Sequence, residues 1–370
     1  MRRPRLYLKE WREIWAGRRL KTGHTQQRIN IGSKMKITTA VLMLLATIPA
    51  CAQKPLPVVD MHLHASAADD NGPPPLGLCV PLLDYVDLVR DPARPWGEIF
   101  MEWQKKPPCP DPVWSPRTDD ALEKETIAVM ERRNVIGVLS GPSERVQQWR
   151  KAAPDRFIPS LQFQFGREEL SPDSLRRLHA EGRFAVFAEV SNQYVGITAS
   201  DPRFEPYLAV AEELDVPVGI HVGTGPPGAP YLGFAQYRAA LHSPLTLEDA
   251  LIRHPKLRVY IMHAGWPMLD DLLAVLWTHP HVHVDVGAIV FGLPRAEFYR
   301  YLQRIVEAGF SKRVMFGSDQ MVWPGVIERS IQAIESAPFL SDTQKRDILY
   351  NNAARFLRFS DADIARHHGR

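Results

Sequence analysis

Four histidines and one aspartate lie where short apolar runs of the sequence end. His62 and His64 close the first run, and His221, His263 and Asp319 close three later ones. Because residues two apart on a strand point to the same face, His62 and His64 can hold one ion between them. Imidazole and carboxylate ligands suit Zn²⁺ or a similar divalent ion and leave positions open for water. These residue types at this spacing therefore predict a metal site that activates water.

Three further carboxylates accompany these residues. Glu189 is expected to be a metal ligand or a substrate contact, or else a structural carboxylate bonded to His263 or Arg183. Asp60 stands two residues before the first histidine, and we expect it to orient a ligand imidazole without binding the metal itself. Asp285 ends a later apolar run and is expected to play a similar supporting role.

The string His279-Pro-His281-Val-His283 also offers imidazoles. It enters a predicted strand from the end opposite to the other candidates, so its histidines would lie far from them. We therefore expect a surface turn there and no metal site.

The elements that must position these side chains alternate between two kinds. Short β-branched runs alternate with longer segments whose apolar residues recur at every third or fourth position, as in amphipathic helices. Eight runs are predicted strands: 58–64, 135–140, 157–163, 185–190, 216–222, 257–263, 282–286 and 314–319. Helices are predicted over 119–133, 143–152, 171–181, 204–214, 245–253, 268–277, 294–308 and 325–336.

This alternation over residues 56–359 predicts an α/β fold, a (β/α)8 TIM barrel, whose active sites form at the carboxyl ends of the strands. The candidate metal ligands all stand at such ends. A doubly wound sheet is the alternative, but it usually carries a glycine-rich phosphate loop after its first strand. Here that strand ends in His62-Leu-His64 without such glycines, which favours the barrel.

A long connection, residues 65–118, separates the first strand from the first helix and is rich in proline and tryptophan. Ordered loops of such length are usually functional, so we expect a lid over the barrel mouth. Cys79 and Cys109 lie within it, and they are either a disulfide or two unpaired thiols. After the eighth unit, one extra helix is predicted over 342–359, followed by a C-terminal tail, 360–370.

With these residues placed, the sequence resembles the amidohydrolase superfamily of metal-dependent barrel enzymes. The resemblance covers about residues 56–359 and is greatest to the amidohydrolase-related branch. It implies that His62, His64 and His221 bind the metal, that Asp319 binds it and shuttles protons, and that His263 acts as an acid or base or binds a second ion. The motifs that carry it are Asp60-Met-His62-Leu-His64, Pro217-Val-Gly-Ile-His221-Val, Ile261-Met-His263-Ala-Gly, Phe316-Gly-Ser-Asp319 and Asn351-Asn-Ala-Ala-Arg-Phe.

In some branches of that superfamily a Glu or a carboxylated Lys at the end of the fourth strand bridges two metals. This chain has Glu189 near that strand end and no lysine, which speaks against a carboxylated-lysine site. The expected cofactor is a divalent metal, with Zn²⁺ favoured by the ligand types. The number of ions stays open.

The first 52 residues predict an export leader. A short basic start, an apolar run and then small residues give 35–52 the three regions of an export signal. We expect translation to start at Met35, with residues 1–34 a basic upstream extension. An A-x-A cleavage site would discard Cys51 and release a periplasmic protein, whereas a lipobox would make Cys51 the lipid-anchored first residue.

The charge balance argues against nucleic acid as a partner. The formal net charge is +3, but residues 1–34 hold ten Lys or Arg against two acidic residues. The rest of the chain carries 35 basic and 40 acidic residues, a net charge of −5, whereas a nucleic-acid-binding body would present a basic face. We expect a small-molecule substrate and membrane contact only through a lipid at Cys51, and we predict no particular oligomeric state.

The predicted function is that of a metal-dependent hydrolase acting on an ester, lactone or amide-like bond of a small molecule. The same branch contains carboxy-lyases (decarboxylases), which a carboxylate-binding Arg in the pocket would favour and export disfavours. A non-catalytic exported binding protein is the third reading, but it would not need both Asp319 and His263. Tyr231, Trp266, Trp323 and the tryptophans of the insert are candidates for an aromatic pocket.

Overall fold

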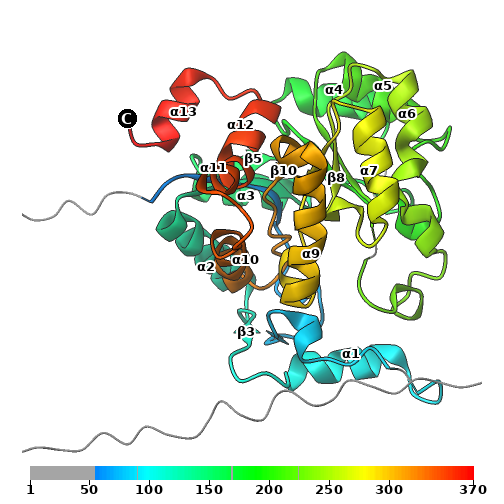
Figure 1. The fold of residues 1–370 in the computed structure, drawn as a ribbon, viewed down its shortest axis with the longest axis vertical. Coiled ribbons are helices and arrows are strands. Elements are labelled where there is room, and N and C mark those ends of the chain that lie inside the picture. The colour runs from blue at the N-terminus through cyan, green and yellow to red at the C-terminus, as the bar shows by residue number, and fades with distance from the viewer. Residues whose placement is uncertain (1–54, 90, 168–169, 224) are drawn as a thin grey trace, which may run out of the picture. The chain divides into compact units, whose positions relative to one another are not determined.

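The computed structural model describes residues 55–89, 91–167, 170–223 and 225–370 (Figure 1). The expected upstream extension (1–34), the export signal (35–52) and the lipid-anchor candidate Cys51 lie outside these residues. Within the described part, no helix has the length and apolar character needed to cross a membrane.

Eight parallel strands form the centre of the molecule. They pair in the orders β1-β4-β5 and β10-β9-β8-β7-β6. Single bridges join the two sheets at both seams, Ser160 with Val186 and Leu63 with Gln320, so the strands follow one another around a ring in chain order. This arrangement confirms the α/β barrel and excludes the doubly wound sheet. The strands are β1 (Val58–His64), β4 (Val135–Ser140), β5 (Phe157–Pro159), β6 (Phe187–Val190), β7 (Val218–His221), β8 (Val259–Met262), β9 (His283–Asp285) and β10 (Val314–Met315).

Helices follow the strands and cover them from outside (Figure 1), and their buried apolar residues, such as Leu122 and Leu302, belong to the same hydrophobic core as the strands. In the first of them, Thr118 caps the start by accepting the amide of Ala121, and Asn134 ends it in the left-handed conformation at φ 51°. The helices are α2 (Asp119–Arg133), α3 (Ser143–Ala152), α4 (Pro172–Ala180), α5 (Glu205–Glu213), α6 (Glu248–Arg253), α7 (Leu269–Thr278), α8 (Ile289–Gly292), α9 (Arg295–Ile305) and α10 (Gly325–Glu335).

The C-terminal segment is more broken than expected. The predicted single helix over 342–359 consists of α11 (Asp342–Arg346), one π-helical turn (Asp347–Asn351) and α12 (Asn352–Phe356). A further helix, α13 (Asp361–His367), occupies most of the expected tail and begins at a capping box made by Ser360 and Asp363. The ring of Phe356 packs on Tyr260 of β8 at 5.7 Å, so these helices fasten onto the barrel strands.

The insert, residues 65–118, has its own small structure. Strands β2 (Gly77–Leu78) and β3 (Val113–Trp114) pair in antiparallel fashion, and α1 (Trp96–Lys105) lies between them in the chain. A disulfide joins Cys79 to Cys109, which confirms that pairing and excludes the alternative of unpaired thiols.

Contacts fasten the insert to the carboxyl side of the barrel strands. The indole N–H of Trp96 donates to the carbonyl of Pro227 at 2.8 Å, in the loop that follows β7. The indole N–H of Trp323, which follows β10, donates to the carbonyl of Leu76 at 2.9 Å. In Figure 1, α1 and β3 of the insert lie on the side opposite to α12 and α13. The insert therefore lies at the end of the barrel where the lid is expected.

Candidate metal centre

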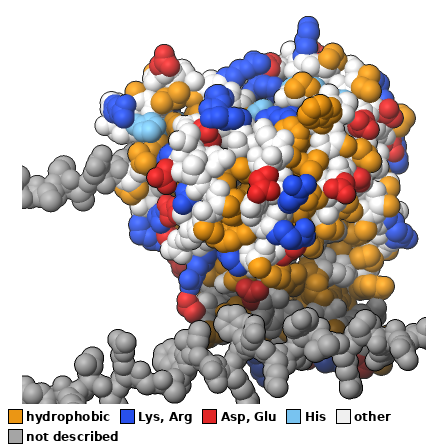
Figure 2. Space-filling model, in the orientation of Figure 1, with side chains coloured by type: hydrophobic (Ala, Val, Ile, Leu, Met, Phe, Trp, Pro, Cys, Tyr) orange, Lys and Arg blue, Asp and Glu red, His pale blue; other side chains and the backbone are white. Residues whose placement is uncertain are grey.

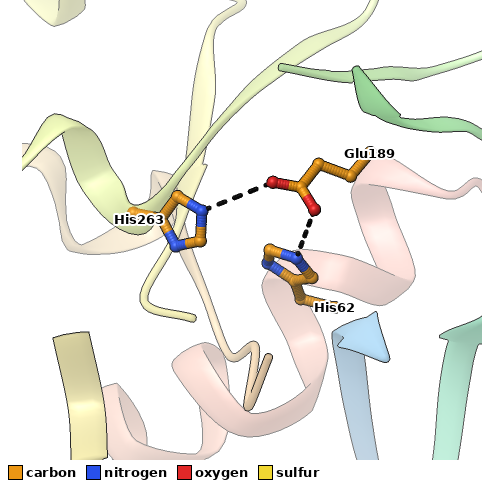
Figure 3. A group of neighbouring side chains, drawn as sticks. All are labelled: His62, Glu189 and His263. Atoms are coloured by element: carbon orange, nitrogen blue, oxygen red, sulfur yellow. Dashed lines mark ion pairs between the residues drawn. The ribbon is translucent and has the colours of Figure 1, made fainter. Parts of the chain in front are cut away.

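Six ionisable side chains converge from the carboxyl ends of five strands. The six are His62 and His64 from β1, Glu189 from β6, His221 from β7, His263 directly after β8, and Asp319, four residues after β10. Figure 3 shows the carboxylate of Glu189 between the rings of His62 and His263. The barrel therefore brings together all of the metal-ligating and catalytic candidates that the sequence offered.

One group of ligand atoms forms around Asp319. Its Oδ1 lies 3.0 Å from Nε2 of His64 and 3.4 Å from Nε2 of His62. The same two nitrogens each lie 3.5 Å from Oε2 of Glu189. Nε2 of His62 and Nε2 of His64 thus each contact both carboxylates, and Glu189 lies where the ligand interpretation of its role requires it.

A second group forms on the other oxygen of Glu189. Oε1 accepts a hydrogen bond from Nδ1 of His221 and lies 3.7 Å from Nε2 of His263. Nε2 of His263 also lies 2.9 Å from Nδ1 of His221. Nδ1 of His263 donates to the carbonyl of Gly287 at 2.9 Å. His221 therefore contacts Glu189 and His263, and Glu189 connects it to the group around Asp319.

Unpaired nitrogen atoms indicate that this cluster fits a metal. Among the described residues, both ring nitrogens of His62 and Nε2 of His221 are buried without a hydrogen-bond partner. A buried polar atom without a partner costs about 1–3 kcal/mol, and a divalent ion would satisfy the ligand nitrogens directly. Triads within ligand distance of one another are His62, His64 and Asp319, and His62, Glu189 and His263. The donor set is thus suited to a divalent metal.

Solvent reaches the cluster at His64, Glu189 and Asp319, which we call its open side. The side chain of His62 is fully buried, whereas those of His64, Glu189 and Asp319 are 12, 12 and 10 % exposed. A substrate would therefore approach over Asp319 and Glu189.

The neighbouring imidazoles determine the pKa values of the two carboxylates in the cluster. Burial alone would raise the pKa of Asp319, but the imidazoles of His62 and His64 lower it below its usual value. Burial likewise opposes ionisation of Glu189, yet its contacts with the imidazoles of His221, His263 and His62 hold its pKa well below the ordinary range. Both carboxylates are therefore ionised at neutral pH.

The pKa values of the imidazoles are shifted in different directions. Burial lowers the pKa of His62, but the charges of Asp319 and Asp285 outweigh it and place the pKa well above 6.5. The pKa of His263 is raised as well, against the effect of burial, by Glu189 and Asp319. Burial and the neighbouring His263 lower the pKa of His221. Without metal, the protons of the cluster are thus held mainly by His62 and His263.

Of the two supporting aspartates, Asp60 does not orient a ring as expected. Its Oδ1 accepts the backbone N–H groups of His62 at 3.0 Å and Ser318 at 2.9 Å, so it joins β1 to the turn after β10. Burial raises its pKa to about 7 despite these hydrogen bonds. Asp285 contacts the ring instead, with Oδ2 3.3 Å from Nδ1 of His62, while its Oδ1 accepts the N–H of His263 at 3.0 Å.

The backbone is unusual at the two residues expected to be catalytic. His263 has φ 60° and Asp319 has φ 54°, the left-handed region that residues other than glycine rarely adopt. Such conformations cost about 1–3 kcal/mol and concentrate at functional sites.

A wall of ring side chains, Tyr194, Tyr237 and His242, lies beside His221 and was not predicted from the sequence. The ring of Tyr194 lies 4.9 Å from that of His221, and Tyr237 and His242 follow it in the same wall. Burial and the charge of Glu189 raise the pKa of Tyr194 well above 10, and burial lowers the pKa of His242 to about 3. No local pattern marks these residues, because the long connection between β7 and α6 brings two of them to the site.

The aromatic candidates from the sequence lie elsewhere. Tyr231 is 60 % exposed, and the indole N–H of Trp266 donates to Glu297 at 3.2 Å. Trp323 is buried beneath the insert. Arg183 bonds to Ser143 and Glu144, so it is not the partner of Glu189.

The histidine string before β9 is not simply a surface turn. His279 ends α7 buried at 7 % exposure, and its Nε2 lies 3.5 Å from Oε1 of Glu248. The packing of Arg313, which donates to the carbonyl of His279 at 3.0 Å, explains the burial. The string begins the strand that Asp285 ends, so it lies at the opposite end of β9 from the cluster.

Comparison with known families decides what kind of barrel this is. The profile of the family described as "Amidohydrolase" matches residues 59–359. The chain belongs to the amidohydrolase family. The fold, the divalent metal and enzymatic activity expected from the sequence resemblance are thereby supported.

One related protein and two solved structures illustrate the range of similar proteins. The chain is 25 % identical to the gamma-resorcylate decarboxylase of Rhodococcus jostii over 272 residues, 62 % of this chain and 79 % of that protein. An uncharacterised TIM-barrel protein from Bordetella bronchiseptica superposes with a TM-score of 0.55 at 17 % identity, covering 85 % of this chain and 100 % of that one. A probable 2-pyrone-4,6-dicarboxylic acid hydrolase from Acinetobacter baumannii gives 0.50 at 16 %, covering 82 % and 99 %. The two structural likenesses concern the fold alone.

Proposed function

We propose that this amidohydrolase is a metal-dependent hydrolase of small molecules. The observation that carries the proposal is the ionised Asp319, whose Oδ1 faces the ligand nitrogens of His62 and His64 at 3.4 and 3.0 Å on the open side of the cluster. This position suits both a ligand and a base for water next to the metal. Zn²⁺ is the ion that we favour for this donor set.

His62, His64, Asp319 and Glu189 would hold the first ion. His221, which the sequence analysis assigned to this ion, contacts the other oxygen of Glu189 together with His263. Either His221 completes the first site after a small shift of Glu189, or it forms a second site with His263 that Glu189 bridges. Metal content distinguishes the two arrangements, since they predict one and two ions per chain.

When bound, the ion would polarise a substrate carbonyl and lower the pKa of water. Asp319, held ionised, would accept the proton of the attacking water and return it to the leaving group. The Nδ1–H of His263 is bonded to the carbonyl of Gly287, so Nε2 is the nitrogen of this ring that would stabilise charge on the substrate oxygen. Asp285 and Asp60 would hold His62 and its strand in place.

Decarboxylation is the second candidate, favoured by the similarity to gamma-resorcylate decarboxylase. A carboxylate substrate needs a cation or the metal to receive it. Within the described residues, every ion pair of Glu189 and Asp319 is with a histidine, and none is with an arginine or lysine. Because the metal could receive a carboxylate as well as an uncharged carbonyl, the reaction products distinguish decarboxylation from hydrolysis. A non-catalytic binding protein would have no use for the strained backbone at Asp319 and His263.

The experiment is a paired assay of metal-loaded and metal-stripped protein on esters, lactones, amides and aromatic carboxylates in H₂¹⁸O. We expect metal-dependent hydrolysis with ¹⁸O in the acid product. Release of CO₂ together with an organic product that holds no ¹⁸O would assign decarboxylation instead. A His62→Ala, His64→Ala double variant should lose most of the metal, and unchanged metal content in it would reject the ligand assignment.

We further propose that the enzyme works outside the cytoplasm, either free in the periplasm or anchored at Cys51. The export signal supports this, as does the disulfide between Cys79 and Cys109, since disulfides persist in oxidising compartments. Fractionation of cells that produce the full chain would test it. Labelling with a radioactive lipid precursor, lost in a Cys51→Ala variant, would identify the anchored form.

A further inference from the structure

His242 is an imidazole that the proposed mechanism does not use. It ends a short helical turn, Ala239–His242, in the connection between β7 and α6. The residue is fully buried, and among the described residues neither of its ring nitrogens has a hydrogen-bond partner. Leaving two such atoms unpaired in the interior is costly, so the ring calls for a partner.

The nearest imidazole with an unpaired nitrogen belongs to His221. The two rings are 5.6 Å apart between centroids and nearly perpendicular, at 82°. Nδ1 of His221 faces Glu189 and His263, whereas its Nε2 is buried and unpaired. At this separation, an N–H of one ring reaches a nitrogen of the other after a small rotation or through one shared water molecule.

Backbone and ring contacts hold His242 against the strand end that carries His221. The N–H of Gly223, two residues after His221, donates to the carbonyl of His242 at 3.0 Å. The ring of His242 packs on that of Tyr237 at 4.2 Å, and the hydroxyl of Tyr237 accepts the N–H of Gly225 at 2.6 Å. These contacts fix the connection between β7 and α6 so that the ring of His242 is held beside the strand end that carries His221.

We propose that His242 is a positioning residue for the metal ligand His221. In the metal-loaded protein, a ring nitrogen of His242 accepts the Nε2–H of His221, directly or through one water, and so favours the tautomer in which Nδ1, which faces Glu189 in the metal-free structure, is free to bind a metal. Ligating histidines usually donate their second N–H to a fixed acceptor in this way. Full burial separates this role from substrate binding, because a substrate would have to displace the aromatic wall to touch His242. The inference rests on the proposed metal site.

The test measures Zn²⁺ affinity of the metal-free protein by competition with a chromophoric chelator. His242→Phe keeps an aromatic ring against Tyr237 but removes the acceptor, and we expect affinity to fall about 10–100-fold. His242→Gln supplies an acceptor again and should recover most of the loss. His254→Gln is the matched control, since His254 is also buried but bonds to Glu205 and Glu212 away from the cluster. It should leave the Zn²⁺ affinity unchanged.

Unchanged affinity in His242→Phe would overturn the inference, and so would equal losses in the Phe and Gln variants, which would indicate packing alone. Wild-type protein that binds no Zn²⁺ would instead reject the proposed metal site itself. If His242→Phe does not fold, nitrogen-15 spectra of the Zn²⁺-loaded wild-type protein decide. A proton on Nε2 of His221, coupled to a nitrogen of His242, supports the proposal, and a proton on Nδ1 of His221 refutes it.

Discussion

Asp319 is the residue at which metal binding and proton transfer can be separated. Its carboxylate touches the ligand nitrogens of two histidines, but those histidines and Glu189 would still surround the ion without it. We predict that Asp319→Asn keeps much of the metal, because an amide oxygen can still approach the ion. Turnover should fall by about 10²–10⁴, the usual effect of losing a general base.

The check is turnover of metal-replete Asp319→Asn on whichever substrate the screen identifies, with metal content measured on the same sample. The acidic limb of the pH–rate profile should disappear with the carboxylate, since the group that must ionise to accept a proton is gone. Near-parental turnover would show that the carboxylate has a structural role only.

The proton on His62 predicts a pH dependence of metal uptake. Its pKa in the folded, metal-free protein lies well above 6.5, because Asp319 and Asp285 outweigh the effect of burial. At neutral pH the ring is therefore charged, and a metal must displace its proton to bind. Affinity should rise with pH and metal should be released on acidification.

Calorimetry of Zn²⁺ binding in buffers of different ionisation enthalpy measures this displacement, and we expect net proton release at pH 7. The same shift sets a stability trend in the metal-free protein. Because the folded pKa is raised, the stabilisation from His62 is fully present below pH about 6.5 and is lost as pH rises through the folded pKa. Metal uptake without proton release would contradict the assignment.

At the scale of elements, the strand ends were predictable and the contacts between them were not. Period-two apolar runs and helical periodicity placed each strand and helix near its observed position, and barrel topology then implied that His62, His221 and Asp319 meet. Glu189 stayed ambiguous, because its role depends on which imidazoles face each of its oxygens. The contact of Asp285 with the ring of His62 depends on the relative heights of β1 and β9 around the ring, which no local pattern encodes.

The insert is held to the barrel by helix α1, and this contact is testable on its own. The ring of Trp96 occupies space that only a glycine at 228 leaves free, since a Cβ there would lie 2.2 Å from its indole nitrogen. We predict that Trp96→Phe, which removes the N–H bonded to Pro227, loosens this contact at a cost of about 1 kcal/mol. If the insert closes over the site, KM should rise more than kcat falls.

Steady-state kinetics and limited proteolysis of the insert would measure this. Trp277→Phe is the matched control, because Trp277 is 81 % exposed on α7 and should tolerate the change. Identical kinetics in the two variants would mean that the contact of Trp96 with the barrel does not affect catalysis.

At the scale of the molecule, the face drawn in Figure 2 carries Lys and Arg side chains interspersed with Asp and Glu. The disulfide connects the redox conditions around the protein to the structure of the insert. It spans 30 residues of the insert, and closing such a loop contributes about 3 kcal/mol in the chain-entropy model.

We predict that a Cys79→Ser, Cys109→Ser double variant keeps its metal, because the cluster lies on barrel strands, but that its insert becomes sensitive to protease and its KM rises. Reductant should reproduce these changes in the parental protein and cause none in the double variant, which makes that variant its own control. Unfolding followed by far-ultraviolet circular dichroism tells whether the lost stability belongs to the insert or to the barrel. A parental unfolding curve combined with rapid cleavage within 65–118 would assign it to the insert, as expected if the barrel folds independently of this disulfide. Parental protease resistance and KM in the double variant would mean that the contacts of Trp96 and Trp323 alone hold the insert in place.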